Sequence, residues 1–553
     1  MNMKTKKIIY SVVIVYAFLL SACSDFLDIE RNNIITGESL TADNLSALTS
    51  PLYNRVWSDF NNNFYFGLGD GMSYNLYAPY SNYIYPYGDL SVTGLTSSVI
   101  SAWASFYVVV QQSNKVIITT NESSATQEAK DQYIAEARFM RGAAYWYLGS
   151  LWGNVIISEN PSDLVANPIL NAHSQKEVFE FAIRDMEFAA KYLPEKGTPA
   201  GRVDKYSAYA MLSRFYLVYS GYLTSNSGSN PNSGTRDQAY LDLAKKAAEK
   251  VLENKAYQLL DNYADLFKIE NNNNSESLFA LQWVPGLNSS SGYGVINAQQ
   301  AYYACSSEIT GDDTGWGDWT RCSYDMIKEY ELNDTIRRKA TWMGYGDFYP
   351  ELSQANGGYL YDRNDSQSIN VKKGVTGSTK DNPAIGRMNS ALNTYMIRLA
   401  EVYLNHAEAI LGNSESTTNT FALESLNKIR VRAGLSPKTS ITWEDIRHER
   451  RVEFCLEGRY WFDLLSRSYY KRQEVINYIT GQERGTIVPY LFDSPNDLRI
   501  DDDRDIGSRP VGRVDASIFL LPYPESELIQ NPKLNEAPVP YSFTEEKITD
   551  LFE

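Results

Sequence analysis

The sequence predicts a fold dominated by α-helices, in which helix pairs pack against an irregular, loop-rich half. Three observations predict it. Apolar residues recur at helical spacing over two long blocks, short side chains lie within these blocks, and two other long stretches are rich in Gly, Asn and aromatic residues. The length of 553 residues would allow two or three domains, but the interleaved pattern indicates a single domain over residues 23–553.

The first helical block covers about residues 100–270. Short side chains such as Ala143 and Ala208 would let its helices approach closely, and Trp103 is expected in the core of an early helix. The other helices expected in this block are residues 131–150, 175–192, 205–222 and 238–254.

The second helical block covers about residues 390–470. Apolar residues over 396–410 recur at i, i+3, i+4 and i+7, which is typical of an amphipathic helix. A second helix over 421–432 is followed by Gly434 as a stop signal, and a third is expected over about 443–465. Helix pairs of this length, joined by short turns, resemble tetratricopeptide units, whose period is about 34 residues.

Two loop-rich stretches, over about residues 60–100 and 283–390, differ from these helical blocks in composition. Loops this long are uncommon inside a compact protein and tend to be functional. We therefore expect ligand recognition in these two stretches.

The start of the chain predicts export and a lipid anchor. A basic beginning and an apolar run over residues 8–20 are typical of a signal peptide, here residues 1–22. The run is too short for an ordinary membrane-spanning helix. The tetrapeptide LSAC resembles the lipobox of bacterial lipoproteins, so Cys23 is the expected lipidated residue, although an ordinary secretory signal with an incidental cysteine would look similar.

Charge and cysteine usage exclude some functions. Loss of residues 1–22 removes three lysines and no acid, so the formal charge goes from −16 to −19, which argues against a nucleic-acid partner. Cys305 and Cys322 could form a disulfide or remain two separate small residues, and Cys455 is expected in the core. The three histidines are too scattered for a histidine-rich metal site.

Acidic residues of the second block could suggest a glycosidase, which needs two carboxylates flanking a cleft. Glu401, Glu408, Glu449, Glu453 and Glu457 are, however, interleaved with arginines, which favours ion pairs between packed helices. No nucleophile elbow, phosphate loop or zinc-protease helix occurs in the sequence. We therefore expect a protein that is not an enzyme and has no cofactor.

An acidic turn near the end of the chain could suggest calcium. Asp501, Asp503 and Asp505 have the first spacings of an EF-hand loop, but Ile506 replaces its glycine and Gly512 its bidentate glutamate. The turn is interpreted as a solvated acidic segment, and no metal site is predicted.

The content of 41 tyrosines and 10 tryptophans exceeds what we expect a core to require. Rings with a polar edge suit both sugar stacking and protein interfaces. The candidate ligand-binding residues in the second loop-rich stretch are Trp316, Trp319, Asp312, Asp313 and Asp318, where rings would stack on sugar and carboxylates would accept hydroxyl hydrogen bonds. A second candidate cluster consists of Tyr74, Tyr77, Tyr80, Tyr83 and Tyr85.

Several motifs in order along the chain resemble the SusD/RagB family, surface lipoproteins of Bacteroidetes that bind nutrients for a partner TonB-dependent transporter. They are CSDFLD (23–28), AEARFMR (135–141), WGNV (152–155), IRLAEVYLNHAEA (397–409), LNKIRVRAG (426–434), ERRVEFCLEGR (449–459) and LPYPE (521–525). The resemblance implies a helical fold with tetratricopeptide-like pairs under an irregular, ligand-facing half.

The resemblance also implies a function. It indicates a glycan-binding lipoprotein, exposed at the cell outer membrane and attached through its lipid alone, that delivers oligosaccharide or polysaccharide to a SusC-like TonB-dependent transporter. A peptide-binding member of the family, a purely structural interaction protein and a glycoside hydrolase are the alternatives. The family's loops vary, so no sugar-contacting residue can be assigned by a fixed motif, and the aromatic clusters could instead pack in loops or contact the transporter.

Overall fold

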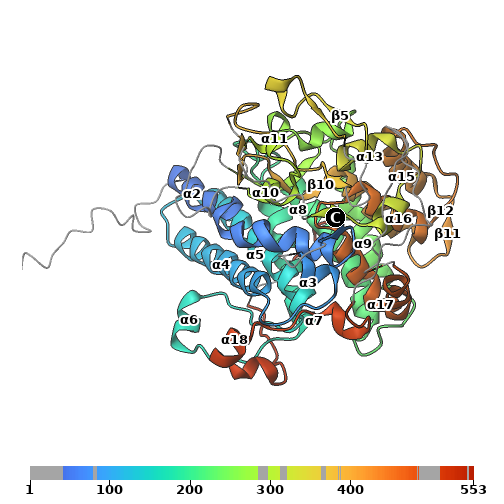
Figure 1. Cartoon of the computed structure of the whole chain (residues 1–553). Coiled ribbons are helices and arrows are strands. Elements are labelled where there is room, and N and C mark those ends of the chain that lie inside the picture. Colours follow the sequence, from blue (N-terminus) through green and yellow to red (C-terminus); the bar gives the residue numbers. More distant parts are fainter. Residues whose placement is uncertain are drawn as a thin grey trace, which may run out of the picture.

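The computed structural model shows a helical layer that carries a loop-rich half along one side (Figure 1). The residues that the structure describes are 42–78, 84–283, 297–311, 320–362, 369–383, 385–386, 388–482, 484, 511–544 and 547–553. The predicted signal segment and Cys23 lie outside these ranges. Among the described helices, none combines the length and the apolar character needed to cross a membrane.

Helix pairs form the layer, as the periodicity predicted. Its long helices are α4 (Ser97–Asn121), α5 (Gln127–Trp152), α7 (Gln175–Tyr192), α8 (Lys205–Thr224), α9 (Gln238–Leu252), α14 (Leu399–Leu411), α15 (Thr420–Arg432), α16 (Trp443–Glu453) and α17 (Tyr460–Gly481). Each of α4, α5, α7, α8, α9 and α14 packs against the next one. Because α9 packs on α14, the long segment between these two helices begins and ends at the helical layer.

The helix starts are fixed by side-chain caps. Ser174 and Glu177 form a reciprocal capping box at α7, and Asp204 and Thr442 begin α8 and α16 in the same way. Close packing follows from small residues: a Cβ added at Gly142 of α5 would lie 3.0 Å from the carbonyl oxygen of Ala182 in α7. Ala143 and Ala208, the short side chains expected in close contact, are both fully buried.

The loop-rich half contains short helices and strands. Its helices are α3 (Tyr85–Gly88), α10 (Gln299–Tyr303), α11 (Ser307–Thr310), α12 (Tyr324–Glu329) and α13 (Thr335–Thr341). Three further short helices lie elsewhere in the chain: α2 (Ala42–Thr49), α6 (Pro161–Ala166) and α18 (Glu525–Gln530). The strands are β1 (Leu76–Tyr77), β2 (Ser277–Leu281), β3 (Arg321–Cys322), β4 (Trp342–Met343), β5 (Phe348–Tyr349), β6 (Tyr359–Leu360), β7 (Asn370–Val371), β8 (Ile385–Gly386), β9 (Asn389–Ser390), β10 (Thr394–Arg398), β11 (Ser416–Thr417) and β12 (Ile441–Thr442).

One small antiparallel sheet organises this half, with the strand order β1-β3-β7-β4. A separate pair, β10 with β2, lies where the loop-rich segment meets the helical layer. The two halves have distinct hydrophobic cores, one between the long helices and one around the sheet.

Three expectations about segments need correction. The helix expected over 443–465 is two helices, because α16 ends at Glu453 and α17 begins at Tyr460. Residues 396–398 belong to strand β10 rather than to the helix that follows. The stretch after residue 60 is not an open loop at its start, since two largely buried π-helical turns, η4 (Phe60–Phe64) and η5 (Gly67–Gly71), lie there.

The break between α16 and α17 has a specific cause. Leu456 and Gly458 adopt positive φ angles of 65° and 64°, and the buried carboxylate of Asp70 accepts hydrogen bonds from both of their amides, at 2.9 and 2.7 Å. Burial raises the pKa of Asp70 to about 6, although these bonds lower it. A distant residue therefore holds this turn.

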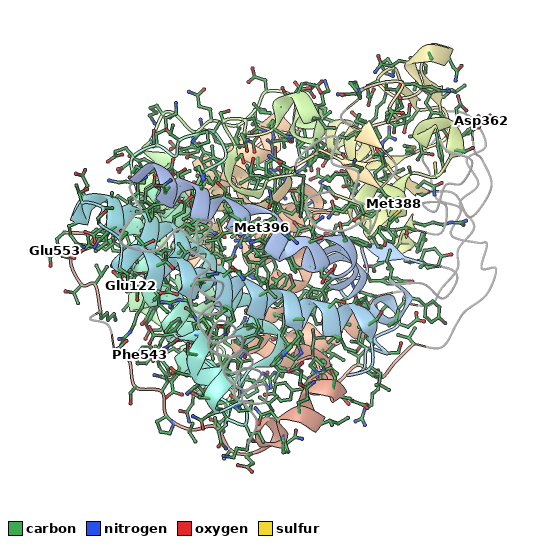
Figure 2. All side chains as sticks on the ribbon, turned by 90° about the vertical axis from the view of Figure 1, so that its left-hand side faces the viewer. Glu122, Asp362, Met388, Met396, Phe543 and Glu553 are labelled. Carbon is green, nitrogen blue, oxygen red and sulfur yellow. The ribbon has the colours of Figure 1, made fainter. Side chains whose placement is uncertain are left out.

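The end of the chain forms a strap across the helical layer, which we call the C-terminal strap (residues 511–544 and 547–553). The amide of Leu521 donates a hydrogen bond of 2.7 Å to the carbonyl of Leu151 at the end of α5. Figure 2 shows Phe543 and Glu553 on the side of the molecule opposite Asp362 of the loop-rich half. The strap thus covers the face of the layer that lies away from the loops.

The aromatic content is largely explained by packing. More than half of the 41 tyrosines are buried, and Trp103 is buried as expected. Phe106, for example, stacks on Tyr147 with ring centroids 5.4 Å apart. The expectation that a core would not need this much tyrosine is wrong for this chain, so aromatic content alone does not indicate a ligand site.

Candidate functional site

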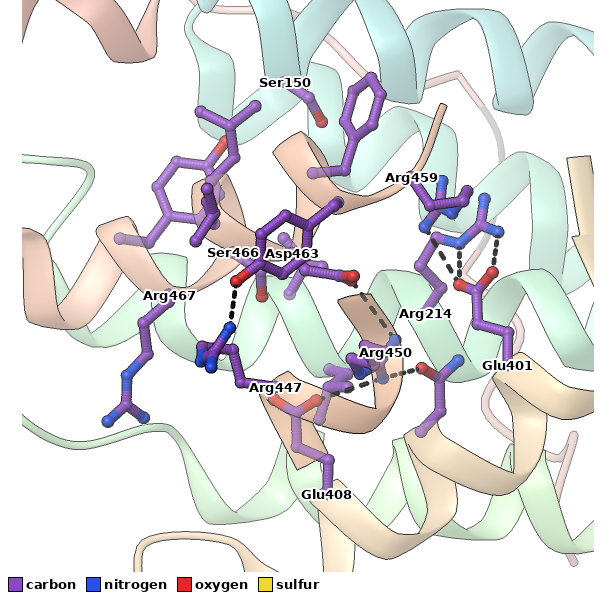
Figure 3. Close-up of a pocket in the computed structure, with 18 of the residues that line it drawn as sticks. Ser150, Arg214, Glu401, Glu408, Arg447, Arg450, Arg459, Asp463, Ser466 and Arg467 are labelled. Carbon is purple, nitrogen blue, oxygen red and sulfur yellow. Dashed lines mark hydrogen bonds and ion pairs between the residues drawn. The ribbon is translucent and has the colours of Figure 1, made fainter. Parts of the chain in front are cut away.

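The acidic residues of α14 lie in a buried layer of ion pairs. Glu401 accepts bonds of 2.6 and 2.7 Å from Arg214 of α8, and Arg459 lies 3.1 Å away (Figure 3). Burial by itself would raise the pKa of Glu401, but the two arginines outweigh it and lower that pKa to about 2. A carboxylate held this way is a structural anion and a poor proton donor or nucleophile.

The acids of α16 and the turn after it are paired in the same way. Arg337 lies 2.6 Å from Glu449, while Arg398 lies 2.6 Å from Glu453 and 2.8 Å from Glu457. The pKa of Glu453 is lowered because surrounding arginines outweigh its burial. The predicted ion-pair interpretation of these acids is therefore confirmed.

A small cavity lies inside this ionic layer. It measures about 40 Å³ and is lined by Arg450, Arg459 and Asp463 among others (Figure 3). Burial raises the pKa of Asp463 to about 6, although both arginines act in the opposite direction. Typical ligand pockets measure about 300–1,000 Å³, so this space can hold ordered water but no sugar.

A much larger open groove lies in the loop-rich half, beside α13. It measures about 990 Å³, at the upper end of the range for small-molecule sites. Four segments form its walls: residues 262–270, 335–340, 348–354 and 372–385. We call it the α13 groove.

The α13 groove combines apolar side chains with amines. Phe348 is 44% exposed and Ile336 is 42% exposed. Lys339 is exposed as well, and the amine of Lys268 forms an ion pair of 2.7 Å with Asp265. Such a mixture of flat apolar surface and hydrogen-bonding groups suits an amphipathic ligand.

Two of the three acids in the α13 groove hold its walls. Glu351 forms an ion pair of 3.2 Å with Lys372, whose pKa is lowered by burial although Glu351 acts to raise it. Asp381 accepts hydrogen bonds from the amides of Gln354 at 2.8 Å and Ser378 at 3.0 Å. These bonds leave the groove suited to binding rather than to acid–base catalysis.

The residues predicted to bind sugar have mixed outcomes. Trp316, Trp319, Asp312, Asp313 and Asp318, with Tyr80 and Tyr83, lie outside the described residues. Tyr77 and Tyr85 are half-buried. Tyr74 needs correction, because its ring is 2% exposed and the guanidinium of Arg484 lies 4.9 Å from the ring centre, so this ring does not face a ligand.

The two predicted aromatic clusters leave the same end of the small sheet. Tyr77 of β1 pairs with Arg321 of β3 in antiparallel register. Ala78, which leads to the tyrosine segment, therefore lies beside Thr320, where the tryptophan segment ends. The described backbone thus brings Ala78 and Thr320, the residues next to the two segments, to neighbouring strand ends, which the sequence could not show.

The remaining predictions concern cysteine and metal. Cys305 and Cys322 are buried and are not joined by a disulfide in this structure, and Cys455 lies in the core as expected. The acidic turn at 501–505 lies outside the described ranges. Within the described part of the chain, no group of three or more metal-binding side chains gathers.

The α13 groove is a feature that the sequence analysis missed. Its walls come from segments separated by up to a hundred residues, and no periodicity links them. The only local signal is the Gly357–Gly358 pair, which predicts the turn between β5 and β6 and places Phe348 opposite Leu360.

Two family models match the chain. The model described as the SusD family matches residues 257–539, about half of the chain. A second model, described as "Starch-binding associating with outer membrane", matches residues 72–217.

Named relatives extend the match over nearly the whole chain. A SusD-like protein of Bacteroides ovatus is 38% identical over 98% of this chain and 99% of its own length. The starch-binding protein SusD of Bacteroides thetaiotaomicron is 24% identical over 60% of this chain and 63% of its own.

Solved structures show the same fold. A crystal structure described as containing xylogluco-oligosaccharide is 38% identical and superposes with a TM-score of 0.82, covering 91% of this chain and all of its own. A laminarin-binding SusD-like protein is 19% identical, with a TM-score of 0.65 over 88% of this chain and 97% of its own, and shares the fold.

Proposed function

The chain belongs to the SusD family, and from this premise we propose that it is a glycan-binding lipoprotein of the outer membrane that passes its ligand to a TonB-dependent transporter. The observation that carries the proposal is the relative of known structure with bound xylogluco-oligosaccharide, which is 38% identical and superposes over 91% of this chain. Likeness of this extent supports a shared class of ligand.

The arrangement of the aromatic segments supports the same conclusion. Ala78 and Thr320 lie side by side at one end of the sheet, so the predicted rings of the two clusters start from adjacent positions. Rings that stack on sugar C–H groups, together with carboxylates that accept hydroxyl hydrogen bonds, would provide the binding surface. In this proposal Trp316 and Trp319 are the main stacking residues, and Tyr77 and Tyr85 contribute at the edge.

The ion pairing of the acidic residues supports binding without cleavage. A glycosidase requires two carboxylates about 5–10 Å apart that flank the scissile bond and are free to exchange protons. The acids of α14 and α16 are instead buried in arginine pairs, as shown for Glu401 and Glu453. The ligand would therefore leave the protein chemically unchanged.

A binding experiment tests the glycan proposal. A soluble form that starts after Cys23 would be run in native gels that contain xyloglucan, starch, laminarin or other polysaccharides, followed by calorimetry and product analysis. We expect retardation by one glycan class, without cleavage, and its loss on Trp316→Ala or Trp319→Ala. Phe421→Ala is the matched control, because this ring is 63% exposed on α15, away from the sheet. Binding to peptides alone, or cleavage of the glycan, would overturn the proposal.

The anchor and the transporter need separate tests. The Cys23→Ala variant should lose incorporation of labelled fatty acid and should no longer fractionate with the outer membrane, because the acyl chains supply the attachment. Affinity purification of the wild-type protein from its own membranes should recover a TonB-dependent transporter. Recovery of the Cys23→Ala variant in the outer membrane would contradict the proposed anchor, and recovery of the wild-type protein without such a transporter would contradict the delivery step.

A further inference from the structure

We propose that the α13 groove is a second saccharide-binding site, which takes the part of a long glycan chain that extends past the aromatic segments. The inference rests on the proposed function, because it assigns a second surface to the same ligand. It concerns only described residues, namely those of the four segments that line the groove.

The first argument is a ring held in place at the mouth of the groove. Phe348 is 44% exposed, so one part of its ring faces outward. The other part packs on Gly358 of the facing strand region, where a Cβ would lie only 2.4 Å from Cζ of the ring. Because the glycine leaves room for it and the β5–β6 pair fixes its backbone, Phe348 presents a surface that needs little ordering when a ligand stacks on it.

The second argument is the set of polar groups that line the same groove. Lys339 and Lys372 place their amines 5.7 and 5.4 Å from the centre of the Tyr349 ring, and the Lys339 side chain is exposed to the groove. Asn262 and Gln354 also line it, and their side-chain amides donate to Asp265 at 3.0 Å and to the Glu351 carbonyl at 3.2 Å. Flat apolar faces beside amine donors and amide groups match the alternating C–H and hydroxyl surfaces of a sugar chain.

The third argument is the position of the groove. Residues of the stretch 372–382 form one wall, and the described residues on either side of the tryptophan-bearing segment, Gly311 and Thr320, lie near this stretch. At its beginning, a Cβ on Gly311 would lie 3.1 Å from Cβ of Ser378. At its end, Thr320 precedes β3, the neighbour of β7, and the register places Thr320 opposite Val371, which directly precedes Lys372 of the groove.

These observations together distinguish the groove from the other spaces in the described part of the molecule. The cavity in the ionic layer is about 40 Å³, and the charged pocket around His448 is lined mainly by polar and charged groups. The α13 groove alone among these joins ligand size, an exposed ring and proximity to the residues that flank the tryptophan-bearing segment.

The test compares wild-type protein and variants with xylogluco-oligosaccharides of two lengths, one short and one at least twice as long. Calorimetry gives the affinity for each length. If the groove contributes, the wild-type protein binds the long form more tightly than the short form, and Phe348→Ala and Lys339→Ala reduce that gain while leaving the short form unchanged. For the ring we expect a loss of roughly tenfold for the long form, on the scale of one aromatic contact.

Leu360→Ala is the matched control. Leu360 is the cross-strand partner of Phe348 on the same hairpin, is 55% exposed and does not line the groove, so its loss should leave both affinities unchanged. Equal affinities of the wild-type protein for both lengths, or an unchanged gain in Phe348→Ala, would overturn the second site while the proposed function stands. Failure of the wild-type protein to bind either length, or any other glycan of the panel, would overturn both.

Discussion

Replacing Gly458 by alanine should destabilise the protein through two separable effects at the turn between α16 and α17. The residue has a φ of +64°, and a side chain in this left-handed region costs about 1–2 kcal/mol. The added Cβ would also lie 2.7 Å from the ring of Tyr65, which is buried and donates a hydrogen bond of 2.9 Å to the carbonyl of Tyr395. Overpacking of this kind costs about 1–3 kcal/mol, so the expected total loss in unfolding free energy is about 2–5 kcal/mol.

Gly228→Ala separates the two effects. Gly228 has a φ of +87°, and nothing lies within 4 Å of a Cβ added there, so only the backbone cost of about 1–2 kcal/mol should appear. Urea unfolding followed by circular dichroism, with the denaturant slope checked for constancy, measures both variants. Equal losses in the two variants would refute the reasoning, because they would show that Tyr65 yields to the added methyl group at no cost.

Three further predictions follow from the ionic layer and the caps. The folded pKa of Glu401 is about 2, below its ordinary value of 4.5, so its contribution to stability is present above pH 4.5 and is lost as the pH falls towards 2. Glu401→Gln should therefore flatten the dependence of unfolding free energy on pH by about 3 kcal/mol over this range, and parallel curves for variant and wild type would contradict it. Arg337→Met should cost about 3–5 kcal/mol, because it leaves Asp334 buried without its cation and leaves Glu449 with Arg430 in place of two arginines, and adding Glu449→Gln should recover part of the loss; no recovery would argue against the pairing. Ser174→Ala removes the capping box of α7 and should lower the unfolding free energy by about 1 kcal/mol, and an unchanged melting temperature would exclude this role.

The helical layer could be predicted from sequence because its signals are local. Residues 175–192 were expected as a helix and form α7 with the same bounds, since a capping residue precedes an apolar stripe. The helix expected over 421–432 differs from α15 by one residue at its start. Where one face of a helix is buried, its stripe of apolar residues is enough to predict the helix.

The errors arose where a distant residue decides the local structure. The carboxylate of Asp70 holds the turn that divides α16 from α17, and no pattern near residue 456 shows this. The burial of Tyr74 depends likewise on Arg484, far along the chain. The α13 groove could not be predicted for the same reason, because it exists only once four separate segments have come together.

The C-terminal strap has a consequence for biosynthesis. Contacts such as that of the Leu521 amide with the carbonyl of Leu151 in α5, and that of the Phe543 ring with the guanidinium of Arg184 in α7, cover helices made hundreds of residues earlier. While the chain is being synthesised, this face of α5 and α7 stays uncovered until the strap has been made. The helical layer therefore completes its packing only after synthesis of these last segments, and any factor that shields the nascent chain must act on this face until then.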